Sequence, residues 1–148
     1  MVALLNVIIS SIQNLISSFP TFAVIVLSLG CQNCDNRGVH HYIREIVENK
    51  NILIFAAAGN NGSPDPFYPA SWPEVISVTA TNRQGGRWAM SNYNDQVELG
   101  GLGYHVLSTD ITKVTDHLGK EIVHHTYKAR SGTSMAAPLV AAAAATGK

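Results

Sequence analysis

The stretch Ser131-Gly132-Thr133-Ser134-Met135-Ala136-Ala137-Pro138, followed by the apolar run 139–145, decides how this chain folds. A helix that begins near Ser134 would carry Ala, Leu and Val on every face, so we expect it to be buried. Pro138 falls in an early turn, where its missing N–H does least harm. A hydroxyl at this end of a buried helix lies beside unpaired backbone N–H groups, which stabilise developing negative charge. Ser134 is therefore a candidate nucleophile, and a simple helix N-cap is the alternative role.

A second stretch supplies a candidate partner for Ser134. Residues 52–58 form a short apolar run that predicts a buried parallel strand, and Gly59-Asn60-Asn61-Gly62 ends it abruptly. Ligands of parallel α/β sheets bind just beyond the carboxyl ends of the strands. Asn60 lies there with an amide that can donate a hydrogen bond to an oxyanion.

Together these motifs resemble those of the subtilisin-like serine peptidases, the subtilases. Gly132-Thr133-Ser134-Met135-Ala136 with Pro138 matches the nucleophile motif of the family, and Ala57-Ala58-Gly59-Asn60 with Gly62 matches its oxyanion motif. Two further segments match in order, Ser28-Leu29-Gly30 and the run 68–78 from Tyr-Pro-Ala-Ser-Trp-Pro to Ser-Val. The resemblance extends from about residue 3 to residue 145.

The resemblance implies a fold and a set of residue roles. The fold is an α/β three-layer sandwich with a mostly parallel sheet, incomplete here, in which residues 1–148 are one partial catalytic domain. Ser134 would attack the scissile carbonyl, and the Asn60 amide with the Ser134 N–H would hold the oxyanion. The expected substrate-binding residues are an edge segment that pairs with the substrate backbone and the wall of the pocket for the residue before the cut: Ser28, Leu29, Gly30, Ala57, Ala58 and Gly59.

The resemblance also indicates that Ser134 lacks the other members of a catalytic triad in this sequence. A serine needs a base, normally a histidine oriented by a carboxylate. In subtilases the Asp and the His precede the first helix seen here, so we expect this chain to be the C-terminal part of the domain. None of its six histidines has the His-Gly-Thr setting of the family, and none of its aspartates matches a catalytic position. The histidines, at 40–41, 105, 117 and 124–125, are expected to be exposed structural residues.

The composition of the 148 residues limits the classes of partner that this chain is expected to bind. Ten acidic and ten basic residues cancel, so nothing points to a nucleic acid or an anionic membrane. The segment 2–16 lacks the basic start of a signal peptide, and no apolar run reaches the roughly 18 residues of a membrane span. The resemblance implies a polypeptide substrate, a secreted or extracytoplasmic location and the missing N-terminal part of the domain as a partner. It implies no cofactor; calcium binds to some members of the family, but no metal site is assigned here.

Cys31 and Cys34 form a C-x-x-C pair after an apolar strand. Three interpretations stay open: a disulfide in an exported protein, a redox site at the turn after the strand, and two unpaired thiols. The disulfide is favoured because of the resemblance.

The remaining pattern predicts helix, strand, helix and strand in succession, as in a parallel α/β sheet. The expected helices are 3–17 and 39–49, and the expected strands or extended pieces are 22–27, 75–79, 88–90, 97–99, 104–107 and 122–127.

Two functions are compatible with this sequence. One is a subtilase-type serine endopeptidase, present as a fragment that is inactive alone; the other is a non-catalytic peptide-binding or interaction module derived from a subtilase. Three neighbouring interpretations are excluded. The segment 128–131 is a poor strand for the nucleophile elbow of α/β-hydrolases. Sedolisins place an aspartate where Asn60 stands, and residues 59–62 match no nucleotide-binding motif.

Overall fold

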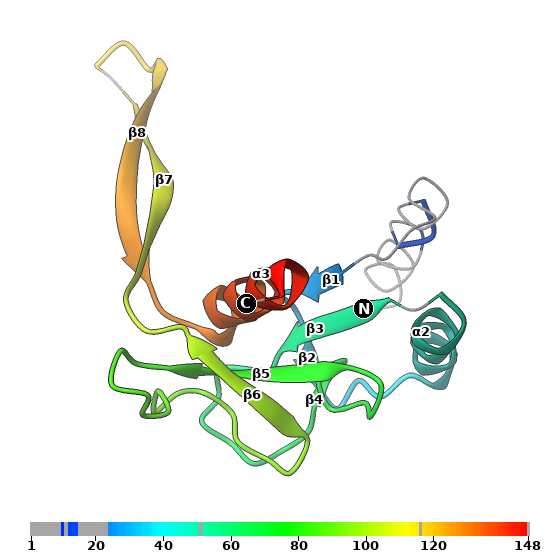
Figure 1. Cartoon of the computed structure of the whole chain (residues 1–148). Helices are drawn as coiled ribbons and strands as arrows, with labels where there is room; N and C mark the ends of the chain where they lie inside the picture. The colour runs from blue at the N-terminus through cyan, green and yellow to red at the C-terminus, as the bar shows by residue number, and fades with distance from the viewer. Residues whose placement is uncertain (1–9, 11, 15–23, 51, 116, 148) are drawn as a thin grey trace.

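A parallel sheet forms the centre of the molecule. The computed structural model describes residues 10, 12–14, 24–50, 52–115 and 117–147. Four parallel strands pair in the order β1-β3-β5-β6 (Figure 1). They are β1 (Val24–Leu27), β3 (Leu53–Ala57), β5 (Ile76–Thr81) and β6 (Val97–Leu102). The predicted α/β class is confirmed.

The two faces of the sheet are covered by different helices. Ile54 on β3 belongs to a cluster with Ile43 of α2 (Arg37–Lys50). Its neighbour Phe55 belongs to a second cluster with Ala136 and Ala137 of α3 (Thr133–Thr146). Because side chains alternate along a strand, β3 packs against both helices at once. The result is the expected sequence of three layers, helix, sheet and helix.

The helix α2 begins earlier than predicted because its first turn has a side-chain cap. Asn36 Oδ1 accepts hydrogen bonds from the backbone N–H groups of Gly38 (3.0 Å) and Val39 (3.1 Å). Asparagine is among the preferred N-cap residues, so the helix starts at Arg37 rather than at residue 39.

The helix α3 corrects one expectation. It was predicted to be buried on every face, but it buries only the side that carries Thr133, Ala136, Ala137 and Ala141. Leu139, on the other side, is 46% exposed, and residues 142–147 are exposed. An apolar composition shows that a helix tolerates burial, but whether a second layer covers it depends on the rest of the fold.

A long antiparallel hairpin projects from the sheet (Figure 1). Its strands are β7 (Val106–Thr115) and β8 (Glu121–Arg130), and they pair from Val106 with Arg130 to Thr115 with Glu121. Leu107 and Tyr127 on these strands are 69% and 71% exposed. The sequence predicted only the short pieces 104–107 and 122–127, and not the hairpin that they begin and end.

A separate two-stranded sheet lies beside the central one. It pairs β2 (Cys31–Gln32) with β4 (Phe67–Tyr68) in antiparallel orientation. Cys31 and Cys34 are joined in a disulfide, with their Cα atoms 5.9 Å apart. Of the three interpretations of this pair, the structure has the disulfide.

Some predicted elements lie outside the described residues or differ from the structure. Most of the predicted helix 3–17, and residues 22–23 of the first predicted strand, lie outside them. Residues 88–90 were predicted to be extended, but only Trp88 contacts a strand, donating its N–H to the Ala80 oxygen of β5 at 2.8 Å, and residues 89–90 lie in a turn. No helix in the described part of the chain is long and apolar enough to cross a membrane.

Candidate active site

Ser134 lies in the first turn of α3, but it is not the residue that caps this helix. The N-cap is Gly132, which has no side-chain capping bond. The Ser134 hydroxyl instead lies 3.3 Å from the backbone oxygen of Ser28, to which it donates. In return, Ser28 Oγ donates to the backbone oxygen of Ser134 at 2.9 Å. The start of α3 and the residue after β1, more than one hundred positions apart, are therefore held together.

Asn60 is fixed by the residue that precedes Ser134. The backbone N–H of Thr133 donates to Asn60 Oδ1 at 2.9 Å, and the Thr133 hydroxyl donates to the same oxygen at 3.0 Å. A backbone N–H can only donate, so the atom that faces it must be the amide oxygen. The NH₂ end of the Asn60 amide therefore points away from Thr133. The arrangement has the polarity that an oxyanion donor needs.

The loop that carries Asn60 is held from two sides. The Gly59 N–H donates to Thr133 Oγ1 at 3.2 Å. On the other side, the fully buried Asn92 accepts the Asn61 N–H on its side-chain Oδ1 (2.8 Å) and donates its backbone N–H to the Gly59 oxygen (3.0 Å). Two side chains, those of Thr133 and Asn92, thus fix this turn from distant parts of the chain.

A pocket of about 240 Å³ joins these residues. It lies where β1 and β3 end and α3 begins, which is the edge of a parallel sheet at which ligands usually bind. Its lining consists of Ser28, Leu29, Gly30, Ala57, Gly59, Asn60, Phe67, Thr133 and Ser134. All but one of the predicted site residues are therefore brought together. The exception is Ala58, which is buried and donates its N–H to the Val78 oxygen at 3.0 Å.

The sequence interpretation missed two residues of the lining, Thr133 and Phe67. Thr133 lies inside the quoted motif, yet its bonds to Asn60 could not be read from a linear pattern. The Phe67 ring lies between two glycines: a Cβ on Gly30 would clash with its Cε1, and a Cβ on Gly59 would lie 2.9 Å from its Cγ. The only sequence signal for Phe67 was its position directly before the Tyr68-Pro69 segment.

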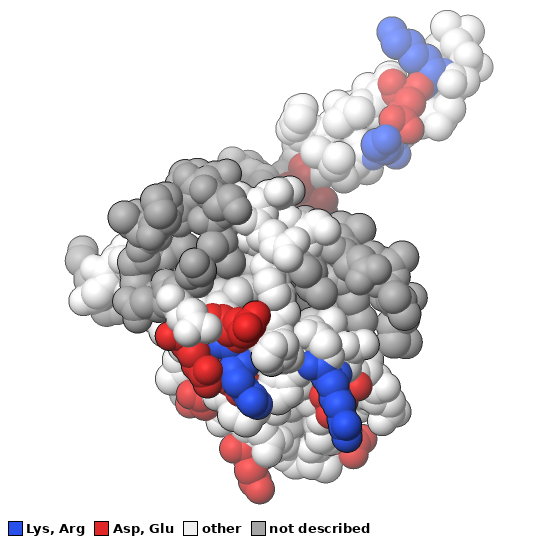
Figure 2. All heavy atoms as spheres, turned by 90° about the vertical axis from the view of Figure 1, so that its right-hand side faces the viewer, with Lys and Arg blue, Asp and Glu red and all other residues white. Residues whose placement is uncertain are grey.

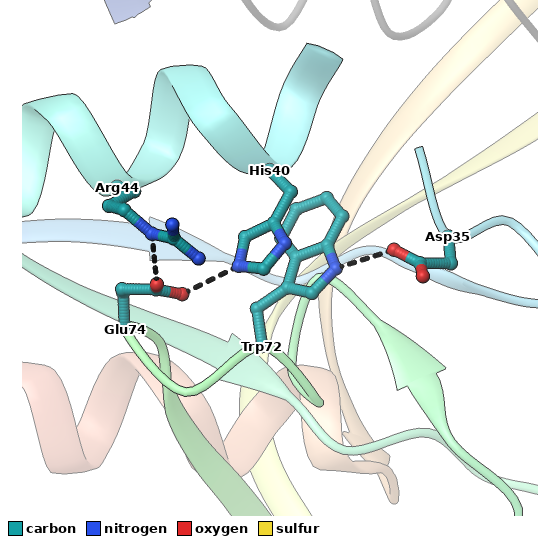
Figure 3. Close-up of polar contacts among 5 residues, drawn as sticks. All are labelled: Asp35, His40, Arg44, Trp72 and Glu74. Atoms are coloured by element: carbon teal, nitrogen blue, oxygen red, sulfur yellow. Dashed lines mark hydrogen bonds and ion pairs between the residues drawn. The ribbon is translucent and has the colours of Figure 1, made fainter. Parts of the chain in front are cut away.

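None of the six histidines lines this pocket, and all six are among the described residues. His40 is the histidine that contacts residues of another segment through both its ring face and its Nε2. Its ring stacks on that of Trp72, with centroids 4.9 Å apart, and its Nε2 lies 2.8 Å from Glu74 Oε2 (Figure 3). Arg44 donates from Nε to the other Glu74 oxygen at 2.7 Å. The expectation that the histidines are exposed is therefore wrong for His40, which anchors α2 to the segment after β4.

The Glu74 carboxylate is stabilised by these partners. Partial burial by itself raises the pKa of Glu74, but hydrogen bonds from Arg44 and His40 outweigh it and hold the pKa below its usual value.

On the face in Figure 2, which includes α2, acidic and basic side chains lie next to each other rather than in patches of one sign. Within the described residues, no three His, Cys, Asp or Glu side chains are placed to hold a metal ion.

Comparison with known proteins identifies the family of this chain. The model of the subtilase family matches residues 6–148. The chain belongs to the subtilase family. A thermophilic serine proteinase of Bacillus sp. (strain AK1) is 38% identical over 122 residues, which are 82% of this subtilase and 27% of that relative.

Two further comparisons agree. The minor extracellular protease Epr of Bacillus subtilis (strain 168) is 31% identical over 80% of this subtilase and 16% of its own length. The crystal structure of a cold adapted subtilisin-like serine proteinase superposes with a TM-score of 0.75 at 25% identity, over 96% of this chain and 47% of that one. This subtilase chain therefore spans about a quarter of the first relative and about half of the solved structure.

Proposed function

We propose that this chain carries the nucleophile and the oxyanion hole of a serine endopeptidase, with Ser134 as nucleophile and Asn60 as oxyanion donor. The observation that supports it most is the pair of bonds from Thr133 to Asn60 Oδ1, which fix the amide so that its NH₂ end is the end able to donate to an oxyanion. The pocket that contains both residues supports it further.

In this proposal a base takes the proton of the Ser134 hydroxyl while its Oγ attacks the peptide carbonyl. The carbonyl oxygen becomes an oxyanion held by the Ser134 N–H and the Asn60 amide. The C–N bond then breaks, the amine leaves with the proton, and water hydrolyses the acyl-enzyme. The base, and the carboxylate that orients it, would come from a segment before residue 1, because the described lining of the pocket contains no ionisable side chain.

The substrate would be a polypeptide that passes along residues 28–30 in extended form. Such backbone pairing gives affinity with little dependence on side chains. The Cys31–Cys34 disulfide agrees with the secreted or extracytoplasmic location that we propose, since disulfides persist in oxidising compartments.

Hydrolysis by a longer chain tests this proposal. The reading frame upstream of Met1 should encode an Asp and a His-Gly-Thr motif, and the chain extended through them should hydrolyse casein. Ser134→Ala should abolish hydrolysis, while Ser108→Ala on the exposed hairpin should not change it. Asn60→Ala should lower turnover by about 10²–10³, a magnitude that comes from subtilisin, itself a member of this family.

The 148-residue chain alone provides the contrasting measurement. We expect it to bind peptide and to react with a fluorophosphonate at Ser134 far more slowly than an active serine peptidase does. Labelling at the rate of an active enzyme would contradict the proposal that the base lies outside this chain. An extended chain that binds peptide equally well with and without Ser134→Ala, but hydrolyses nothing, would instead favour the non-catalytic binding module.

A further inference from the structure

The Cys31–Cys34 loop follows directly after the pocket residues 28–30. Its first residues form β2, in which Cys31 pairs with Tyr68 and Gln32 with Phe67 on β4. Phe67 also lines the pocket. The loop therefore lies beside two parts of the pocket lining, residues 28–30 and Phe67.

One further contact ties this wall to the residue after the loop, and two contacts hold the wall itself. Asp35 Oδ1, directly after Cys34, accepts the indole N–H of Trp72 at 2.9 Å (Figure 3). Ser71 Oγ accepts the Phe67 N–H at 2.9 Å, and the Ser71 N–H donates to the Phe67 oxygen at 3.0 Å. The segment 67–72 is thus held at its start by the loop that the disulfide closes and at its end by Asp35, the residue directly after Cys34.

The contact between Gly30 and Phe67 transmits any movement of this loop to the pocket. A Cβ on Gly30 would lie 2.7 Å from the Tyr68 oxygen and would clash with the Phe67 ring, so the two segments touch without a gap. Neither cysteine belongs to the two core clusters of the sheet, whereas Ala70 and Trp72 of the segment 67–72 pack in the cluster that contains Ile54. Opening the disulfide should therefore loosen the Phe67 end of the segment, while its Trp72 end and the sheet stay packed.

We propose that the Cys31–Cys34 disulfide positions the Phe67 wall of the Ser134 pocket, so that its reduction weakens and broadens peptide binding. The proposal rests on the proposed function of this pocket. Cys31 is more exposed than Cys34, which is 9% exposed, so a dithiol has access to one end of the bridge. A dithiol thiolate attacks one sulfur and breaks the S–S bond, and its second thiol resolves the mixed disulfide. The products are two protein thiols and one cyclic oxidised dithiol, with two electrons transferred.

The test compares the 148-residue chain before and after treatment with dithiothreitol. Two fluorescein-labelled peptides are used, one with Ala and one with Leu as its C-terminal residue. The Kd of each peptide is measured by fluorescence anisotropy. We expect the Kd for the Ala peptide to rise about tenfold on reduction, because a pocket wall that is no longer held in place fits the bound side chain less closely. The preference for Ala over Leu should also fall, since a displaced Phe67 admits the larger side chain. A merely structural role would weaken both peptides equally.

Two test variants and one control variant make this test decisive. The double variant Cys31→Ser/Cys34→Ser should behave like the reduced chain and should not respond to dithiothreitol. Ser71→Ala, with the disulfide intact, should shift the Ala-to-Leu preference in the same direction, and Ser108→Ala should not. If reduction unfolds the whole chain, Ser71→Ala alone decides, and an unchanged preference overturns the proposal.

Hydrogen exchange separates this proposal from the proposed function. Reduction should lower protection at residues 67–68, which pair with the disulfide loop, and leave β3 and β5 protected. Equal binding and equal protection in both redox states would overturn the role of the disulfide. If the oxidised chain binds neither peptide, the proposed function fails, and the exchange of residues 67–68 still decides whether the disulfide holds the wall.

Discussion

Thr133 holds Asn60 by two hydrogen bonds to a single oxygen, one from its backbone N–H and one from its hydroxyl. The same hydroxyl accepts the Gly59 N–H at 3.2 Å, and Thr133 is fully buried. The hydroxyl therefore links the turn after β3 to the start of α3. Its neighbour Ser134 depends on this link for its position relative to Asn60.

Thr133→Val should destabilise the chain by about 1–3 kcal/mol, because it leaves the buried Gly59 N–H without its acceptor. Thr133→Ser keeps the hydroxyl and removes only a methyl group, so it should cost less. Urea unfolding of the two variants measures the difference. A larger loss for Thr133→Ser would show that packing of the methyl group, rather than the hydrogen bonds, stabilises this position.

Phe67→Ala should shift the preference of the pocket towards larger side chains. The ring fills the space that Gly30 and Gly59 leave open, so its removal enlarges the pocket. Differences in fit of this size discriminate between side chains by about tenfold or more. The measurement is the ratio of the Kd values of the Ala and Leu peptides, with Phe67→Leu as a graded control. An unchanged ratio in Phe67→Ala would mean that substrate side chains do not reach Phe67.

Glu74 should make the stability of the chain sensitive to acid. Its pKa is lower in the folded chain than the ordinary value of 4.5, since the bonds from Arg44 and His40 outweigh the effect of burial. A carboxylate with a lowered pKa stabilises the fold when the pH is above its pKa in the unfolded chain. This stabilisation is lost as the pH falls through its pKa in the folded chain. The free energy of unfolding should therefore decrease more steeply below about pH 4.5 in the natural chain than in Glu74→Gln.

Urea unfolding between pH 3 and pH 7 measures this dependence. Glu48→Gln, which removes an exposed carboxylate from α2, the helix of Arg44 and His40, is the matched control and should leave the steep decrease in place. Parallel curves for the natural chain and Glu74→Gln would show that the ion pairs of Glu74 contribute nothing to stability.

Much of the central fold could be predicted from apolar runs. The strands β3 and β5 and the helix α2 follow from continuous or periodic apolar residues, because burial on two faces or one leaves a distinct pattern. The pocket could be predicted in outline, since ligands bind where parallel strands end and two motifs fell at such points. Asn60 and Ser134 lie in that pocket, and their catalytic roles stay predictions.

What could not be predicted depends on contacts between distant residues. Phe67 is a pocket residue only because Gly30 and Gly59 face its ring, and no local pattern records that. The exposed side of α3 was missed because Ala and Leu look alike whether or not a layer covers them. The hairpin mixes polar and apolar residues on both strands, so its pairing depends on register rather than on burial.

Shortening this hairpin should leave the sheet as stable as before. Its strands pair with each other, and its side chains are largely exposed, so little packing against the sheet is lost. Replacing residues 109–127 by Asn-Gly would join Ser108 to Lys128, which already face each other across the ladder. We expect the free energy of unfolding to change by less than about 1 kcal/mol. Gly103→Ala, at the base of the hairpin, is the contrasting control, because its Cβ would lie 2.7 Å from the Gly132 oxygen and should destabilise the chain by about 1–3 kcal/mol. A loss on truncation as large as that of Gly103→Ala would show that the hairpin contributes to the core.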